Sequence, residues 1–368
     1  MARMNVILGA AAVGLALSFA GGQATCAELA KVDLAPDKVG TVADSWPISK
    51  VCGTKKIKVA YADGWGGNYW RHITRAEFED EASKCPNITE VKYTDGEGDA
   101  GKHIADIQAL VAQHFDVILV FADTGEAVLK ELRKATEAGV AVVPFTTGDA
   151  PFGKIGVDYT TRATESQIAL GQTEADWMIK ALGGKGNVII NGGFPGNPMS
   201  SSQAVGWKEA FAKAPGIKVL EAPDTNWDPA LAQKTTAAEI AKYPEIDGII
   251  AETTGPIRAF QAAGKPVPAF FGQELNDLDC LWADSNPKFK MADAPAHTWL
   301  VRLALRKGVA AAEGVADTEP SLINLSIVED STSSDAKMQP TCAKDLPMDS
   351  IYKSSMLSKD QIKKLLSK

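Results

Sequence analysis

Residues 57–65 read Ile-Lys-Val-Ala-Tyr-Ala-Asp-Gly-Trp, an apolar run that ends in a polar and aromatic turn. The same unit of apolar run, turn and helical stripe then repeats along the chain. Short runs rich in Val, Ile and Phe are typical of strands buried on both faces of a sheet. Strands that alternate with helices predict a parallel sheet with helices on both faces.

The number of repeats predicts two such sheets. One helical stripe is formed by Ile104, Ile107, Leu110 and Val111. The strands are too many for one small sheet, and 368 residues suit two domains. We therefore predict an α/β protein with two doubly wound parallel-sheet lobes, built from strands at residues 57–62, 90–94, 117–121, 140–145, 188–190, 218–221, 249–251 and 269–271.

The N-terminus has the pattern of a secretory signal. Arg3 supplies the positive charge, residues 6–19 are apolar, and small residues follow. A membrane anchor is the alternative, but the apolar run is short for a bilayer span. We expect residues 1–27 to be removed, residues 28–49 to form an irregular leader, and the mature protein to be periplasmic.

Cysteine usage agrees with export. Cys26 lies at the signal boundary and is either removed or, in a less favourable sequence context, modified by lipid. Cys52, Cys85, Cys280 and Cys342 form an even set, which predicts disulfides in an oxidising compartment. Free buried thiols are the alternative.

Charge and motifs argue against several functions. The net charge of −8 excludes a general nucleic-acid-binding protein, which needs a basic face. Residues 96–103 approach the phosphate-binding loop pattern, but His103 replaces the hydroxyl that should hold magnesium. Neither H-E-x-x-H nor G-x-S-x-G occurs. We expect no catalytic residues, no metal and no cofactor.

Polar or aromatic residues follow nearly every predicted strand. Ligands of doubly wound sheets bind beyond the carboxyl ends of the strands. Asp123 and Asp228 are equally compatible with turn and N-cap chemistry. Trp65, Trp70 and Trp227 argue more strongly for a ligand, because a large aromatic ring in a loop can stack on the apolar face of a sugar.

The order and spacing of several segments resemble one family. Residues 55–330 are similar to the ribose-binding-protein branch of periplasmic sugar-binding proteins, the substrate receptors of ABC importers. The segments that carry the resemblance are residues 57–61 with the loop 66–70, the run 115–120 after a helix, the run 138–143, and the helix 206–211.

The resemblance implies two lobes joined by three crossovers, near Asp158, Asp293 and Val328. The first lobe would hold residues 50–157 and 295–328. The second would hold residues 158–294 and 329–368.

This arrangement also implies the disulfide pairing. Cys52 and Cys85 would meet at the edge of the first lobe away from the ligand, and Cys280 and Cys342 would both fall in the second lobe.

The resemblance also implies a ligand set. Where the family has charged sugar-binding residues, this chain has Thr146-Thr147, Ser201 to Gln203 and Thr253-Thr254, which predicts a small neutral sugar or sugar alcohol. An anionic ligand bound by Arg71 or Arg258 is the alternative, but we expect both side chains on helix surfaces. The predicted binding residues are Trp65, Asn68, Tyr69, Trp70, Asp123, Thr146, Thr147, Ser201, Gln203, Trp227, Asp228, Thr253, Thr254, Gln273 and Glu274.

The function implied is capture of this ligand by hinge closure and delivery to an ABC transporter permease. We expect a monomer. A receptor for chemotaxis or signalling with the same fold is one alternative. An exported carbohydrate-active α/β enzyme is the other.

Overall fold

The central strand of the first sheet, β4 (Val117–Phe121), is buried along its whole length. Its first, third and fifth side chains pack into one apolar cluster, and the second and fourth pack into another. Successive side chains of a strand point to opposite faces, so an unbroken apolar run needs helices on both faces. The computed structural model, which describes residues 1, 29 and 31–367, has this arrangement.

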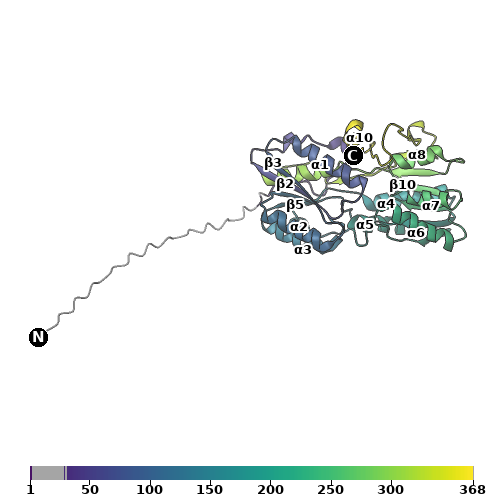
Figure 1. The fold of residues 1–368 in the computed structure, drawn as a ribbon, viewed down its shortest axis with the longest axis horizontal. Coiled ribbons are helices and arrows are strands. Elements are labelled where there is room, and N and C mark those ends of the chain that lie inside the picture. Colours follow the sequence, from purple (N-terminus) through teal and green to yellow (C-terminus); the bar gives the residue numbers. More distant parts are fainter. Residues whose placement is uncertain (2–28, 30, 368) are drawn as a thin grey trace.

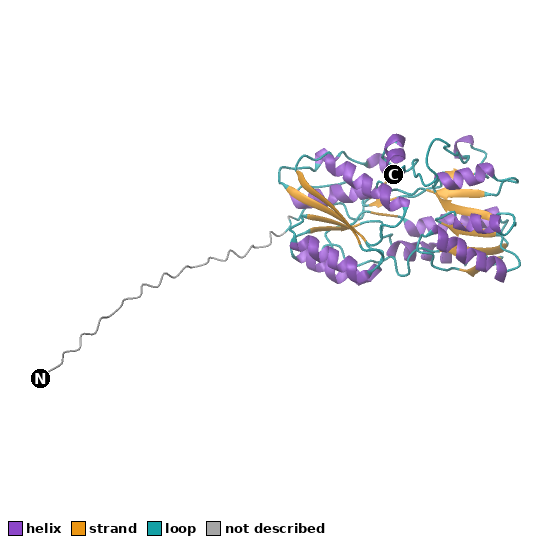
Figure 2. Ribbon diagram, in the orientation of Figure 1, coloured by secondary structure: helices purple, strands orange, loops and turns teal. Residues whose placement is uncertain are grey.

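The first sheet is parallel, with the strand order β3-β2-β4-β5. Helices α1 and α9 cover one face and α2 and α3 the other (Figures 1 and 2). Its elements are β2 (Ile57–Asp63), β3 (Ile88–Asp95), β5 (Ala141–Pro144), α1 (Tyr69–Ser83), α2 (Ala100–Ala112), α3 (Leu129–Glu137) and α9 (Leu300–Glu313).

The second sheet has the order β13-β11-β10-β9-β7-β8 and forms the other lobe, on the right in Figure 1. All its pairings are parallel except that of β13 with β11, an antiparallel edge that the sequence did not indicate. Its elements are β7 (Gly186–Asn191), β8 (Ile217–Glu221), β9 (Gly248–Ala251), β10 (Ala269–Gln273), β11 (Met291–Ala294), β13 (Glu329–Asp330), α4 (Gln167–Ala181), α5 (Pro198–Phe211), α6 (Pro229–Lys242), α7 (Gly255–Ala262) and α8 (Asn276–Asp284).

Every predicted strand is present, so the predicted fold class is confirmed. The two-residue strands β1 (Val39–Gly40), β6 (Thr164–Glu165) and β12 (Leu322–Ile323) form a further small sheet. This sheet joins the leader to the segments that pass between the lobes. The leader is less irregular than expected, because Leu34 and Ile48 pack into the core of the first lobe.

The segments between the lobes differ slightly from expectation. Asp158 accepts hydrogen bonds from Arg133 of α3, so it lies within the first lobe. The chain reaches the second lobe only after β6. Helix α10 (Lys359–Leu366) contacts α1 of the first lobe, although the stretch 329–368 was assigned to the second. The exact lobe boundaries stay a prediction.

Both predicted disulfides are present, Cys52–Cys85 and Cys280–Cys342. The predicted signal peptide and Cys26 fall outside the residues that the structure describes. Among the residues that it does describe, no helix is long and apolar enough to cross a membrane.

Candidate functional site

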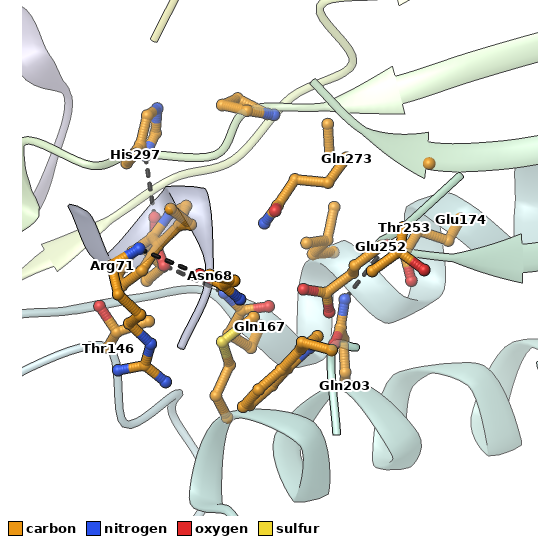
Figure 3. Close-up of a pocket in the computed structure, with 18 of the residues that line it drawn as sticks. Asn68, Arg71, Thr146, Gln167, Glu174, Gln203, Glu252, Thr253, Gln273 and His297 are labelled. Carbon is orange, nitrogen blue, oxygen red and sulfur yellow. Dashed lines mark hydrogen bonds and ion pairs between the residues drawn. The ribbon is translucent and has the colours of Figure 1, made fainter. Parts of the chain in front are cut away.

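A cavity lies between the two lobes, at the carboxyl ends of strands from both sheets (Figure 3). Phe121 and Thr146 line it from the first sheet, and Thr253 and Gln273 line it from the second. The empty space between its walls, open solvent included, is about 690 Å³.

The first-lobe wall is the N-terminus of helix α1. The Asn68 side chain accepts a hydrogen bond of 3.0 Å from the backbone N–H of Arg71 and so caps the helix. The cap fixes the first turn, and Asn68, Tyr69 and Trp70 all line the cavity. Trp70 also packs edge-on against Phe121, with ring centroids 5.5 Å apart.

The second-lobe wall includes Trp227, which is only 8% exposed. Its backbone φ is 51°, in the left-handed region that a bulky side chain rarely adopts. A Cβ on Gly193 would lie 2.2 Å from the ring, so only glycine leaves room for the indole there. Strained backbone of this kind is concentrated at ligand-binding and switch segments of proteins.

The predicted residues divide into two groups. Asn68, Tyr69, Trp70, Thr146, Gln203, Trp227, Thr253 and Gln273 line the cavity. Trp65, Asp123, Thr147, Ser201, Asp228, Thr254 and Glu274 do not, and each is engaged elsewhere.

Helix and turn chemistry accounts for several of the second group. The Asp228 carboxylate accepts a hydrogen bond of 2.7 Å from the Leu231 N–H and caps α6. The Ser201 hydroxyl donates to the carbonyl of Asn197, the N-cap residue of its own helix. Thr147 donates to the carbonyl of the next residue, and Thr254 donates to a carboxylate of α8.

The other members of that group have tertiary partners. Asp123 forms an ion pair with Arg71, and Trp65 packs against Phe194 with ring centroids 5.4 Å apart. Glu274 accepts hydrogen bonds from the backbone N–H groups of Tyr352 and Lys353.

Arg71 corrects the sequence interpretation. It was expected on a helix surface, but its side chain is 2% exposed and lines the cavity. It forms ion pairs with Asp63 at 2.8 Å and Asp123 at 2.7 Å, and its guanidinium lies 3.4 Å from the centroid of the Phe121 ring. Its charge is therefore already compensated. Arg258, in contrast, is on the surface as expected, with 45% of its side chain exposed.

Burial perturbs the Asp123 carboxyl. Desolvation raises the pKa of Asp123 to about 7, and the Arg71 guanidinium opposes this shift. On the first-lobe side the cavity is therefore bounded by a buried ion-paired group. The Arg71 charge is not free to bind an anionic ligand.

Further lining residues were not singled out as ligand residues by the sequence. The polar ones are Glu165, Gln167, Glu174, Glu252 and His297. Glu252 directly follows the predicted strand 249–251, and this position could have identified it as a ligand residue. Glu174 lies within helix α4, where nothing in the local sequence distinguishes it from a surface glutamate.

One pair joins segments that pass between the lobes. His297 Nδ1 lies 3.0 Å from the Glu165 carboxylate, and Glu165 also accepts a hydrogen bond of 3.1 Å from Gln167. Glu165 belongs to β6, and His297 follows β11. Both residues line the cavity, so a ligand there would contact the connecting segments as well as the lobes.

A separate buried ionic group lies outside the cavity. Lys353 Nζ is 2.6 Å from both Asp279 Oδ2 and Glu329 Oε1. It ties the C-terminal segment to α8 and β13 of the second lobe.

Comparison with known proteins gives the family. Residues 61–285 match the model of the family described as periplasmic binding protein domain.

The chain belongs to this family. Among curated relatives, it is 26% identical over 192 residues to a xylitol-binding protein of Mycolicibacterium smegmatis, covering 50% of this chain and 53% of the relative. It is 28% identical over 183 residues to the galactofuranose-binding protein YtfQ of Escherichia coli, covering 48% of this chain and 55% of the relative. The chain spans about half the length of these relatives.

Several solved structures share the fold of this chain. The Caulobacter myo-inositol binding protein, bound to myo-inositol, is similar with a TM-score of 0.67 at 20% identity; the match covers 75% of this chain and 94% of that one. A solute-binding protein from Agrobacterium vitis with bound allitol is similar with a TM-score of 0.64 at 20% identity, covering 74% and 94%. These structures therefore share the two-lobed α/β fold of this chain.

Proposed function

We propose that this protein is the solute-binding component of an ABC importer and captures a small sugar or sugar alcohol between its lobes. The observation that carries the proposal is the inter-lobe cavity, where aromatic rings combine with neutral hydrogen-bonding groups. Tyr69, Trp70 and Trp227 offer flat apolar faces. Such faces suit the C–H surface of a sugar.

The neutral groups suit hydroxyls. Thr146 and Thr253 have buried hydroxyls without a hydrogen-bond partner among the described residues. Asn68, Gln203 and Gln273 add amide groups that can both donate and accept. A buried polar group without a partner is unfavourable, so a polyhydroxylated ligand would satisfy groups that the protein leaves open.

Closure of the lobes is the proposed mechanism. The ligand would contact Asn68 and Thr146 of the first lobe and Gln203 and Trp227 of the second. A ligand that contacts both lobes binds the closed state more tightly than the open one and shifts the population toward it. The closed form would then be the form that a membrane permease recognises.

The relatives support this proposal. The xylitol-binding, galactofuranose-binding and myo-inositol-binding proteins are named for sugars or polyols. We further propose that the chain is exported to the periplasm with its signal peptide removed, binds its ligand without converting it, and acts as a monomer.

A thermal-shift screen of the mature chain tests the proposal. The panel consists of sugars, sugar alcohols and small organic acids. A ligand that binds only the native state raises the Tm, by roughly 2.7 kcal/mol of added stability at a hundredfold excess over Kd. Stabilisation by one or a few polyhydroxy compounds, recovered unchanged, is the expected result.

Stabilisation by anions alone would contradict the proposed ligand class. Conversion of a bound sugar would favour an exported enzyme instead. If a sugar binds the chain but is not taken up through an importer, a signalling receptor would be favoured.

A further inference from the structure

Two carboxylates of the cavity form no ion pair with any residue that the structure describes. The ion pairs around the cavity join Arg71 to its two aspartates and His297 to Glu165. In the part of the chain that the structure describes, no ion pair reaches Glu174 or Glu252, although both line the cavity.

The two glutamates both line the second-lobe wall, near enough for the Glu252 charge to act on Glu174. Glu174 comes from helix α4 and accepts hydrogen bonds from Gln203, at 3.2 Å, and from the Trp207 indole. Glu252 follows strand β9, lies beside Trp227 and Gln203, and points into the cavity (Figure 3).

Burial without a counter-charge perturbs both groups. Desolvation, with a smaller contribution from the neighbouring Glu252 charge, raises the pKa of Glu174 to about 8, although the hydrogen bond from Trp207 opposes the shift. Desolvation also raises the pKa of Glu252 to about 7. A buried and a half-buried carboxylate are costly when both are charged, and a cation placed between or beside them removes that cost.

The neighbouring rings also favour a cation. Trp227 lies beside Glu252, and Tyr69 and Trp70 line the same cavity. The faces of aromatic rings attract an ammonium group, and carboxylates bind it through short charge-assisted hydrogen bonds. Hydroxyl groups alone would also bond to a carboxyl group. They carry no positive charge that would stabilise the ionised form of both.

We infer that the ligand is a sugar or sugar alcohol that carries a protonated amino group, held against Glu174 and Glu252. This inference rests on the proposed function and narrows its ligand class to amino sugars and amino alditols. The hydroxyls of such a ligand would use the neutral groups of the cavity. Its ammonium would replace the cation that the protein does not supply.

Matched pairs of compounds test the inference by titration calorimetry of the mature chain. The pairs are D-glucose with D-glucosamine, D-galactose with D-galactosamine, and D-glucitol with 1-amino-1-deoxy-D-glucitol, extended to the amino-deoxy derivatives of every sugar or alditol that raises the Tm. We expect the amine to bind roughly 10- to 100-fold more tightly than its neutral parent, the usual effect of a hydrogen bond to a charged group.

Each outcome has a distinct meaning. Neutral parents that bind as tightly as their amines, or more tightly, overturn the inference and leave the proposed function standing, with the neutral ligand that the sequence predicts. If no member of any pair and no other sugar or alditol binds, the proposed function fails as well.

Glutamine variants locate the effect. Glu252→Gln and Glu174→Gln should each reduce the amine-over-neutral ratio roughly tenfold, and the Tm of each variant without ligand reports correct folding. Glu239→Gln is the matched control, because Glu239 is another buried glutamate with a raised pKa that does not line the cavity. A ratio that survives both cavity substitutions would refute the assignment.

Discussion

Replacing Trp227 with alanine should weaken ligand binding far more than it changes the fold. The ring lies between the cavity and Phe194, with ring centroids 5.8 Å apart, and is 8% exposed. Loss of a buried aromatic anchor costs roughly 2–4 kcal/mol of binding free energy, which is a roughly 30- to 900-fold increase in Kd.

Stability should change less, because one side of the ring faces the cavity rather than packed protein. The backbone adds a second effect. Alanine keeps the unfavourable φ of 51°, whereas glycine adopts it without strain. Trp227→Gly should therefore bind as poorly as Trp227→Ala and be more stable, by up to about 1 kcal/mol.

The assay is titration calorimetry with the tightest ligand from the thermal-shift screen, together with denaturant unfolding of each variant. Trp282→Ala is the control, since Trp282 belongs to α8, donates to the Phe289 carbonyl and does not line the cavity. A Kd of Trp227→Ala within about threefold of the unmodified chain, far below the loss expected of an anchor, would refute the role of Trp227 in the site.

Three further perturbations concern stability. Burial raises the pKa of Glu239 from 4.5 to about 7, so the folded state retains a proton that the unfolded state has lost, and the free energy of unfolding should fall between about pH 4.5 and pH 7. Glu239→Gln should flatten this decline and add roughly 1–3 kcal/mol at pH 8; an unchanged pH profile in urea unfolding would contradict it. Lys353→Met should lower the free energy of unfolding at neutral pH by roughly 3 kcal/mol, because it leaves the buried Asp279 and Glu329 carboxyls without their cation; urea unfolding measures the loss. An unchanged free energy of unfolding would exclude this explanation. Replacing Cys280 and Cys342 together by serine removes a disulfide between residues that are 62 positions apart. The restored chain entropy of the unfolded state should lower the free energy of unfolding by about 4 kcal/mol, which calorimetric unfolding would measure. A Tm that does not change would show that the bond contributes little.

The strands could be predicted because their signal is local. The run 117–121 is apolar at every position, and in the structure each face of β4 has its own helical cover. The two-residue strands β6 and β12 gave no such signal. Each is held by pairing with a partner far away in the chain, and a pairing of that kind leaves no periodic pattern in its own sequence.

Part of the site could also be predicted, because the ends of the strands could be located from the local sequence. Thr146, Thr253 and Gln273 line the cavity because residues at the ends of parallel strands share one edge of a sheet. Asp228 follows the same rule but caps α6, since a short carboxylate before a helix is closest to the backbone N–H groups of its first turn. Sequence position does not distinguish the two roles.

The sequence by itself determined the α/β class, the strand order along the chain, the family resemblance and the loops that contribute to the cavity. Those properties depend on local hydrophobic patterns and on short polar turns. The tertiary structure decided the charge of the site. Arg71 is compensated by Asp63 and Asp123, while Glu174 and Glu252 come from different elements and form no ion pair among residues 31–367. The electrostatics of a buried group depend on every charge around it in space, and the chain brings those charges together only when it folds.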